Sequence, residues 1–185
     1  MTDVMLDLET LGVDSHSVIT VIAAIKFRRG ENWERDIENI DINKLDTFYR
    51  RIDIQSCKDI GLKSSKETEN WWKEQDSDIK YEAIDNPDRN CVKDVLIEFK
   101  KWLGSYPVKI WGNGSSFDCT ILSNSYKKSD MDVPWKFWNE RDLRTMLDIG
   151  NIKSYNLPKY KKHHALFDCY RQIVGFQMAE NNLIN

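Results

Sequence analysis

Three stretches in the first third of the chain have the pattern of buried strands. In residues 4–8 apolar side chains flank a single carboxylate, and residues 18–27 are rich in β-branched residues and almost entirely apolar. Residues 47–52 form a third candidate strand, after an acidic connection over residues 31–46. Short apolar runs rich in Val, Ile and Thr are typical of strands with one or both faces covered.

The apolar period then changes to that of helices. Val92, Val95, Leu96 and Phe99 recur at helical spacing, which predicts a helix over residues 91–103 that stops at Gly104. Further helices are expected from Ser65 onward and over residues 117–126, 143–149 and 165–179. A fourth strand, residues 108–111, runs into a turn of small residues at 112–114.

This order of elements predicts one α/β domain over residues 1–185, with a mixed sheet flanked by helices. A chain of 185 residues fits a single domain, and it contains no internal repeat or Pro/Gly/Ser-rich linker. No apolar run approaches the roughly 18 residues of a membrane span, and no signal-peptide pattern begins the chain, so we expect no membrane association.

Composition and charge exclude few classes of function. Cysteines 57, 91, 119 and 169 lie far apart without the paired spacing of a zinc site, which favours reduced thiols in a cytoplasmic protein. Net charge is −3, yet residues 100–162 carry 12 Lys+Arg against 6 Asp+Glu. This segment is compatible with a basic binding face and equally with a solvated surface.

The first candidate for chemistry is the pair Asp7 and Glu9. Side chains two apart on a strand project from the same face, so both carboxylates enter one site. Two carboxylates repel each other unless protons or cations intervene, and hard oxygen ligands suit Mg²⁺ or Mn²⁺. The alternative is a pair of surface carboxylates on an edge strand.

Two further motifs stand at the starts of helices. Asp118 follows the small residues after the fourth strand, at the sheet end where α/β proteins place their sites. Helix capping by Ser115, Ser116 or Asp118 is the alternative.

In the second of these motifs, His163 could accept a proton near neutral pH, and Asp168 could add a metal ligand. Here the alternative is an exposed pair between His164 and Asp168, four residues apart.

Taken together, the three motifs resemble those of the DEDDh exonucleases, the family of proofreading exonuclease subunits. The order is Asp-x-Glu on the first strand, Phe-Asp after a later strand and His-x-Ala-x-x-Asp at the final helix, and it covers the chain from Asp7 to Asp168. Residues 70–75 and 136–145 look like the phage-type exodeoxyribonuclease A branch, which also contains bacterial exoribonucleases. One departure is Gly114, where many proofreading enzymes have Asn.

The resemblance implies a ribonuclease H-like exonuclease fold with a mostly five-stranded sheet and two divalent cations, Mg or Mn. Asp7, Glu9 and Asp168 would hold one cation, and Asp7 with Asp118 the other. His163 would be the general base, and nucleoside 5′-monophosphates would leave one at a time from a single-stranded 3′ end.

For substrate contacts, the resemblance assigns the terminal nucleotide to Thr10, Leu11 and Gly12, with the Leu11 side chain against the last base. For seven further residues two roles stay open. The tryptophans could stack on bases or pack in the core, and the arginines could bind phosphate or form internal ion pairs. These residues are Trp71, Trp72, Trp111, Trp135, Trp138, Arg141 and Arg144.

We expect DNA in preference to RNA, and a homodimer is left open. Two rival functions are weaker. An aspartyl phosphatase would need a second Asp where Glu9 stands, and a non-catalytic nucleic-acid-binding module would be expected to lack a motif residue, yet none is missing.

Overall fold

The computed structural model describes residues 2–33, 40–158 and 163–184 and shows a five-stranded mixed sheet. Its strands are β1 (Thr2–Thr10), β2 (Ile19–Phe27), β3 (Thr47–Arg51), β4 (Val108–Gly112) and β5 (Glu140–Asp142), in the order β3-β2-β1-β4-β5. Antiparallel pairing joins β3, β2 and β1, and parallel pairing joins β1, β4 and β5. The predicted α/β class with a mixed sheet is confirmed.

The helices are α1 (Ile54–Asp59), α2 (Lys66–Lys73), α3 (Ser77–Lys80), α4 (Val92–Leu103), α5 (Ser115–Lys128), α6 (Leu143–Ile149) and α7 (Ala165–Ile184). Short 3₁₀ or π segments are η2 (Ile42–Lys44), η3 (Tyr81–Asp85), η4 (Phe137–Asn139) and η5 (Ser154–Asn156). As predicted, α2 begins after Ser65 and α4 ends at Gly104, which has a left-handed φ of 84°. The last helix continues to Ile184 and not to Ala179, and part of the acidic connection, residues 34–39, lies outside the described residues.

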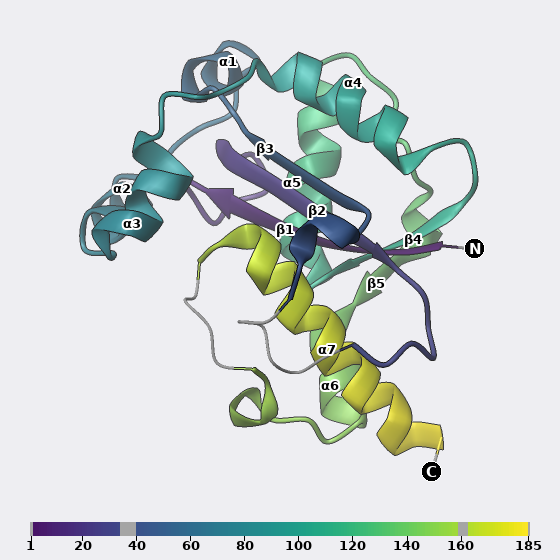
Figure 1. Cartoon of the computed structure of the whole chain (residues 1–185). Helices are drawn as coiled ribbons and strands as arrows, with labels where there is room; N and C mark the ends of the chain where they lie inside the picture. Colours follow the sequence, from purple (N-terminus) through teal and green to yellow (C-terminus); the bar gives the residue numbers. More distant parts are fainter. Residues whose placement is uncertain (1, 34–39, 159–162, 185) are drawn as a thin grey trace.

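Helices cover both faces of the sheet (Figure 1). On one face the α7 residue Phe176 packs on Phe27 of β2 and Trp111 of β4, with ring centroids 5.3 and 4.8 Å apart. On the other face Phe99 of α4 packs edge-on against Phe48 of β3 at 5.0 Å. Because side chains alternate along a strand, the odd-numbered residues of β1 face α7.

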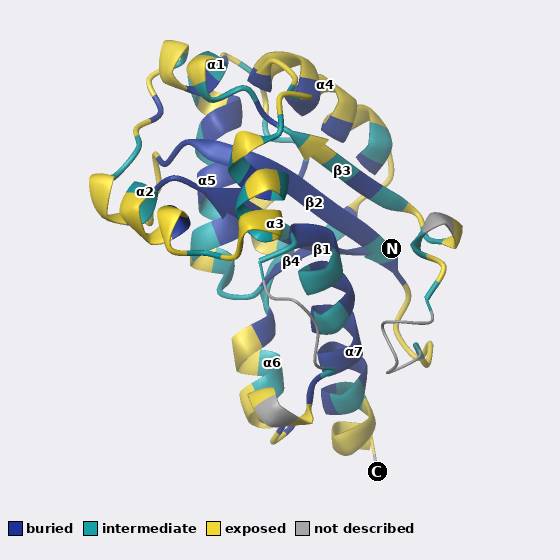
Figure 2. Ribbon diagram, turned by 60° about the vertical axis from the view of Figure 1, so that its left-hand side comes forward, coloured by how far each residue is buried: buried dark blue, intermediate teal, exposed yellow. Residues whose placement is uncertain are grey.

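The sheet centre is the most deeply buried part of the molecule, shown by the dark blue β1 and β2 in Figure 2. Val4, Leu6, Ile22 and Ile25 have no exposed surface. Each such side chain contributes about 1.5–3 kcal/mol on burial, so the central strands are a rigid platform for polar side chains at their ends. None of the helices in the described part of the chain has the length and apolar character that crossing a bilayer needs.

Candidate active site

Three carboxylates from two elements meet at the end of β1. Asp7 and Glu9 project from the β1 face that α7 covers, and Asp168 lies in the first turn of α7. One oxygen from each of the three lies within 4.8 Å of the others. The alternation argument is therefore confirmed for these positions: the two β1 carboxylates share a face and reach the same point as Asp168.

Asp118 reaches the same cavity from α5. Its Oδ1 accepts a hydrogen bond from the backbone N–H of Leu8 at 3.1 Å, which fixes the carboxylate beside β1. Gly112 makes room for it, because a Cβ there would lie 3.1 Å from Asp118 Oδ2. The cavity has a volume of about 330 Å³, and the side chains of Asp7, Glu9, Asp118, His163 and Asp168 all line it.

The electrostatics show that this cluster is unfavourable as four bare anions. Burial, followed by the charges of Asp118, Glu9 and Asp168, raises the pKa of Asp7 well above its usual range. Burial also raises the pKa of Glu9 to about 8 and that of Asp118 to about 7, and it raises the pKa of Asp168. No salt bridge in the described part of the chain neutralises the four groups.

This arrangement fits divalent cations. Carboxylate oxygens within 4.8 Å of one another form the donor set that Mg²⁺ and Mn²⁺ prefer, and a cation removes the repulsion that raises these pKa values.

Gln172 belongs to the site, although the sequence analysis missed it. Its Nε2 donates to Asp7 Oδ1 at 2.6 Å, and its side chain is buried. Gln172 stands four residues after Asp168 on α7, so both project from the same helix face. That spacing was the available signal. The hydrogen bond holds Asp7 in one orientation and lowers its pKa, against the larger effect of burial.

His163 stands at the entrance to α7 with a left-handed φ of 67°. Its backbone N–H donates to Asp168 Oδ2 at 2.8 Å, which links the residue to the carboxylate cluster. The imidazole packs edge-on against Trp71, with centroids 4.9 Å apart, and lines the cavity. Its position suits exchange of a proton with a group inside the cavity.

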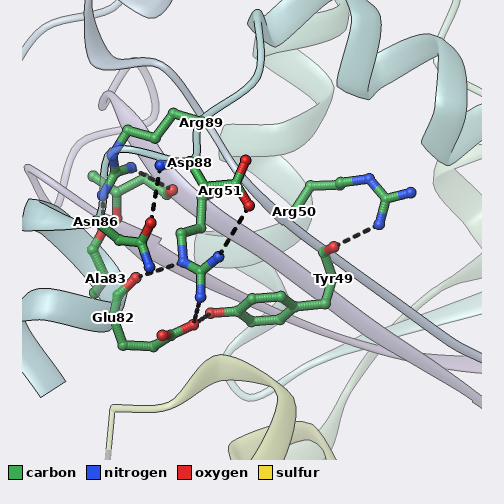
Figure 3. Close-up of polar contacts among 9 residues, drawn as sticks. Tyr49, Arg50, Arg51, Glu82, Ala83, Asn86, Asp88 and Arg89 are labelled. Atoms are coloured by element: carbon green, nitrogen blue, oxygen red, sulfur yellow. Dashed lines mark hydrogen bonds and ion pairs between the residues drawn. The ribbon is translucent and has the colours of Figure 1, made fainter. Parts of the chain in front are cut away.

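The alternative prediction, an exposed pair between His164 and Asp168, is wrong. His164 is half-buried, stacked on Tyr49 at 5.6 Å and edge-on to Phe167 at 4.7 Å. Beneath it, Tyr49 and Arg51 both bond the Glu82 carboxylate (Figure 3). Burial lowers the pKa of His164, so this residue packs as a neutral ring that anchors the start of α7 on β3.

A second, apolar pocket of about 390 Å³ adjoins the carboxylates and shares Leu8, Glu9 and Phe117 with their cavity. Of the three residues that the resemblance assigns to the terminal nucleotide, Thr10 and Gly12 line this pocket and Leu11 does not. Only 5% of Leu11 is exposed, because it turns into the core, while Val13 lines the pocket and is 76% exposed.

The candidate stacking residues differ in how far they are buried. Trp72, Trp111 and Trp135 are buried, which leaves Trp71, 39% exposed and lining the apolar pocket, and Trp138, 60% exposed.

Comparison with known proteins identifies the family. The model of the 3′-5′ exoribonuclease Rv2179c-like domain matches residues 2–179. The chain belongs to this family. An exodeoxyribonuclease of Enterobacteria phage T4 is 24% identical to this Rv2179c-like chain, over 97% of the chain and 89% of the phage protein.

Solved structures show the same fold. E. coli ExoI in a zinc-bound complex with single-stranded DNA has a TM-score of 0.66 and 16% identity, and it covers 100% of the Rv2179c-like chain. The chain matches only 41% of ExoI, about two fifths of its length. The nuclease domain of 3′hExo, a DEDDh family member bound to rAMP, has a TM-score of 0.54 and 14% identity, covering 97% of this chain and 92% of that domain. The chain therefore has the fold of these nucleases and belongs to the family of the 3′-5′ exoribonuclease Rv2179c-like domain.

Proposed function

We propose that this chain hydrolyses single-stranded DNA from its 3′ end and releases nucleoside 5′-monophosphates. The observation that carries the proposal is the meeting of the Asp7, Glu9 and Asp168 oxygens within 4.8 Å, in a cavity that His163 also lines. In the reaction a water oxygen bonds to the terminal phosphorus, the bond from phosphorus to the 3′ oxygen breaks, and that oxygen leaves with a proton.

The chain's residues fit two divalent cations, Mg or Mn. Asp7, Glu9 and Asp168 would hold one, and Asp7 with Asp118 the other. When bound, the two cations supply an acidified water and neutralise the charge that grows on the phosphate. In this scheme the four carboxylates serve only to bind the cations. Gln172 keeps Asp7 aligned through its 2.6 Å hydrogen bond.

His163 is the proposed general base. A side-chain imidazole nitrogen takes the proton of the attacking water, the role that histidine most often has in general base catalysis. The Trp71 ring packs against the imidazole and restricts its rotation, and the hydrogen bond from His163 N–H to Asp168 fixes its backbone. His164 takes no part in proton transfer, because its ring is packed on Tyr49.

The apolar pocket beside the carboxylates is the proposed site of the 3′-terminal nucleoside. Val13, Trp71 and Phe117 offer it apolar and aromatic surface, and aromatic rings accept any base by stacking. Thr10 and Gly12 line the pocket wall, and the Thr10 hydroxyl donates a hydrogen bond to the Gly12 carbonyl at 2.7 Å. A base in this pocket excludes water from the side of Glu9.

RNA is the second candidate substrate. The matched family is described as an exoribonuclease domain, whereas the phage relative is an exodeoxyribonuclease. The choice depends on contacts to one 2′-hydroxyl group.

The test uses matched 5′-labelled DNA and RNA oligomers with Mg²⁺, with Mn²⁺ and with excess chelator. We expect a 3′-shortened ladder with either cation, faster for DNA, and none in chelator. Degradation that persists in chelator would refute the metal-dependent assignment, and a faster RNA ladder would make RNA the substrate. Asp132→Asn, which changes an exposed carboxylate, is the control for charge removal.

A further inference from the structure

Gly114, the departure from the proofreading pattern, lies under an arginine. Its φ is +99°, and a Cβ built there would lie 3.4 Å from Cζ and 3.5 Å from Nε of Arg144. A Cβ at position 114 would be in ordinary van der Waals contact with this guanidinium from α6, and the left-handed φ by itself favours glycine there. Gly114 thus lets the guanidinium of Arg144 lie close to the backbone at the start of α5.

The β4–β5 edge of the sheet holds Arg144 in place. Asp142, at the end of β5, pairs with Gly112 and accepts hydrogen bonds from Ser115 N at 2.7 Å and Thr145 N at 2.9 Å. One carboxylate therefore joins the first turns of α5 and α6. Arg144 lies between these anchored residues, two positions after Asp142, so its backbone is fixed with respect to Asp118 on α5.

Within the part of the chain that the structure describes, Arg144 differs from the neighbouring arginines in donating no hydrogen bond, although, against the larger effect of burial, its charge lowers the pKa of Asp118. Arg141 Nη1 donates to the carbonyls of Trp138 and Glu140, and Arg171, which also lines the cavity, donates to backbone carbonyls through Nε and Nη2. Across residues 2–33, 40–158 and 163–184, the hydrogen bonds and ion pairs found include none from the Arg144 guanidinium. It lines the carboxylate cavity near Asp118, with a planar set of five donors available for an anion.

The order of features across the sheet suggests which anion this is. The apolar pocket is lined mainly by α2 and the end of β1, and the carboxylates lie next to it. Arg144 comes from the first turn of α6, which follows directly on the edge strand β5. Arg144 does not line the apolar pocket. A strand with its last nucleoside in that pocket and its scissile phosphate at the carboxylates would continue towards Arg144.

We infer that Arg144 binds the phosphate one position 5′ of the scissile phosphate, and so directs the single strand over the β4–β5 edge. This rests on the proposed function. A guanidinium forms two parallel hydrogen bonds with a phosphate, so binding aligns the strand as well as attracting it. It also offsets the repulsion between a nucleic acid and a cavity lined by four carboxylates.

The experiment compares substrates with and without that phosphate. Wild type, Arg144→Ala, Arg144→Lys and the control Lys101→Ala are assayed on an oligothymidylate and on the p-nitrophenyl ester of thymidine 5′-monophosphate, which has no second phosphate. Lys101 is exposed near the end of α4, which leads to the opposite end of β4 from the site. A third substrate is the oligomer with a neutral methylphosphonate at the linkage 5′ of the scissile one.

We expect Arg144→Ala to lower kcat/KM on the normal oligomer about 10–100-fold, the range for a hydrogen bond to a charged group. Arg144→Lys should recover part of the loss. The ester and the methylphosphonate oligomer should respond to Arg144→Ala less than threefold, and Lys101→Ala should behave as wild type on all three substrates.

Equal losses on all three substrates would overturn the inference, since Arg144 would then act on Asp118 or on the fold. An unchanged rate on the normal oligomer would overturn it as well. Binding of a labelled oligomer, followed by fluorescence anisotropy against salt concentration, gives a readout without hydrolysis: Arg144→Ala should reduce the salt slope by about one. Failure of every variant to hydrolyse DNA or RNA would instead contradict the proposed function.

Discussion

Removing one charge from the carboxylate cluster should stabilise the protein when no metal is present. Asp7→Asn is the sharpest change, because Asn keeps an oxygen that can accept the hydrogen bond from Gln172 Nε2. Asp7 also carries the largest set of like-charged neighbours, Asp118, Glu9 and Asp168. The substitution therefore removes repulsion and leaves the packing almost unchanged.

The magnitude follows from the spacing. Two full charges 4.8 Å apart repel by about 3.5 kcal/mol at an effective dielectric constant near 20. Partial protonation reduces this, since burial raises the pKa of Asp7 itself, that of Glu9 to about 8 and that of Asp118 to about 7. Replacing a charged hydrogen-bond acceptor with a neutral one costs roughly 1 kcal/mol. The net gain expected at pH 8.5 is about 1–3 kcal/mol, or about 2–10 °C in Tm for a chain of this size.

The assay is thermal and urea unfolding followed by circular dichroism at pH 8.5, in chelator and again in Mn²⁺. In chelator Asp7→Asn should unfold at the higher temperature. Added Mn²⁺ should raise the Tm of wild type more than that of the variant, because the variant has lost a ligand. Asp132→Asn, at an exposed carboxylate, should change neither result. A variant less stable than wild type in chelator would refute the repulsion argument and give Asp7 a structural role.

Two further predictions concern the histidines and pH. His163→Ala should lower turnover by about 10²–10⁴-fold, while the Mn²⁺-induced rise in Tm persists. His164→Ala should mainly lower the free energy of unfolding, by roughly 1–2 kcal/mol, because its packing on Tyr49 is lost. Steady-state rates and Tm values of both variants test this, and the reverse pattern would make His164 the base. In chelator, the free energy of unfolding should fall as pH rises from about 4.5 to 8. The raised pKa values of Glu9 and Asp118 make the folded state hold more protons than the unfolded state in that window. A Tm that does not change with pH would contradict the raised pKa values of these buried carboxylates.

The face shared by Asp7 and Glu9 was predictable because side chains alternate along a strand, whereas Asp118 and Asp168 were assigned through the resemblance of the three motifs. Asp7 and Glu9 alternate with apolar residues on a strand, and Asp168 follows a helix start. The contact expected for Leu11 came from the family resemblance and not from a pattern in this chain. The register of β1 against β2 shifts between Glu9 and Thr10, so the turn presents Val13 and buries Leu11.

The elements that escaped prediction are short and polar. The strand β5 has three half-buried residues, Glu140, Arg141 and Asp142, and so shows no apolar alternation. The helix α1 has six residues, of which only Cys57 is buried. Such segments form because neighbouring elements supply their partners: β5 pairs with β4, and α1 is capped by Asp53, whose side chain accepts from Ser56 N. Local propensity alone does not specify them.

The central position of β1 explains how a folded chain tolerates this cluster. The strand pairs with β2 on one side and β4 on the other, and apolar residues such as Leu6 and Leu8 anchor it in the core. Asp7 therefore cannot move away from Asp118 and Asp168 without breaking paired backbone, so repulsion among them persists until cations or protons bind. A more pliable strand would relieve the repulsion by shifting, and the site would lose the geometry on which cation binding depends. The rigid sheet thus keeps the carboxylates at its end close enough together to bind cations.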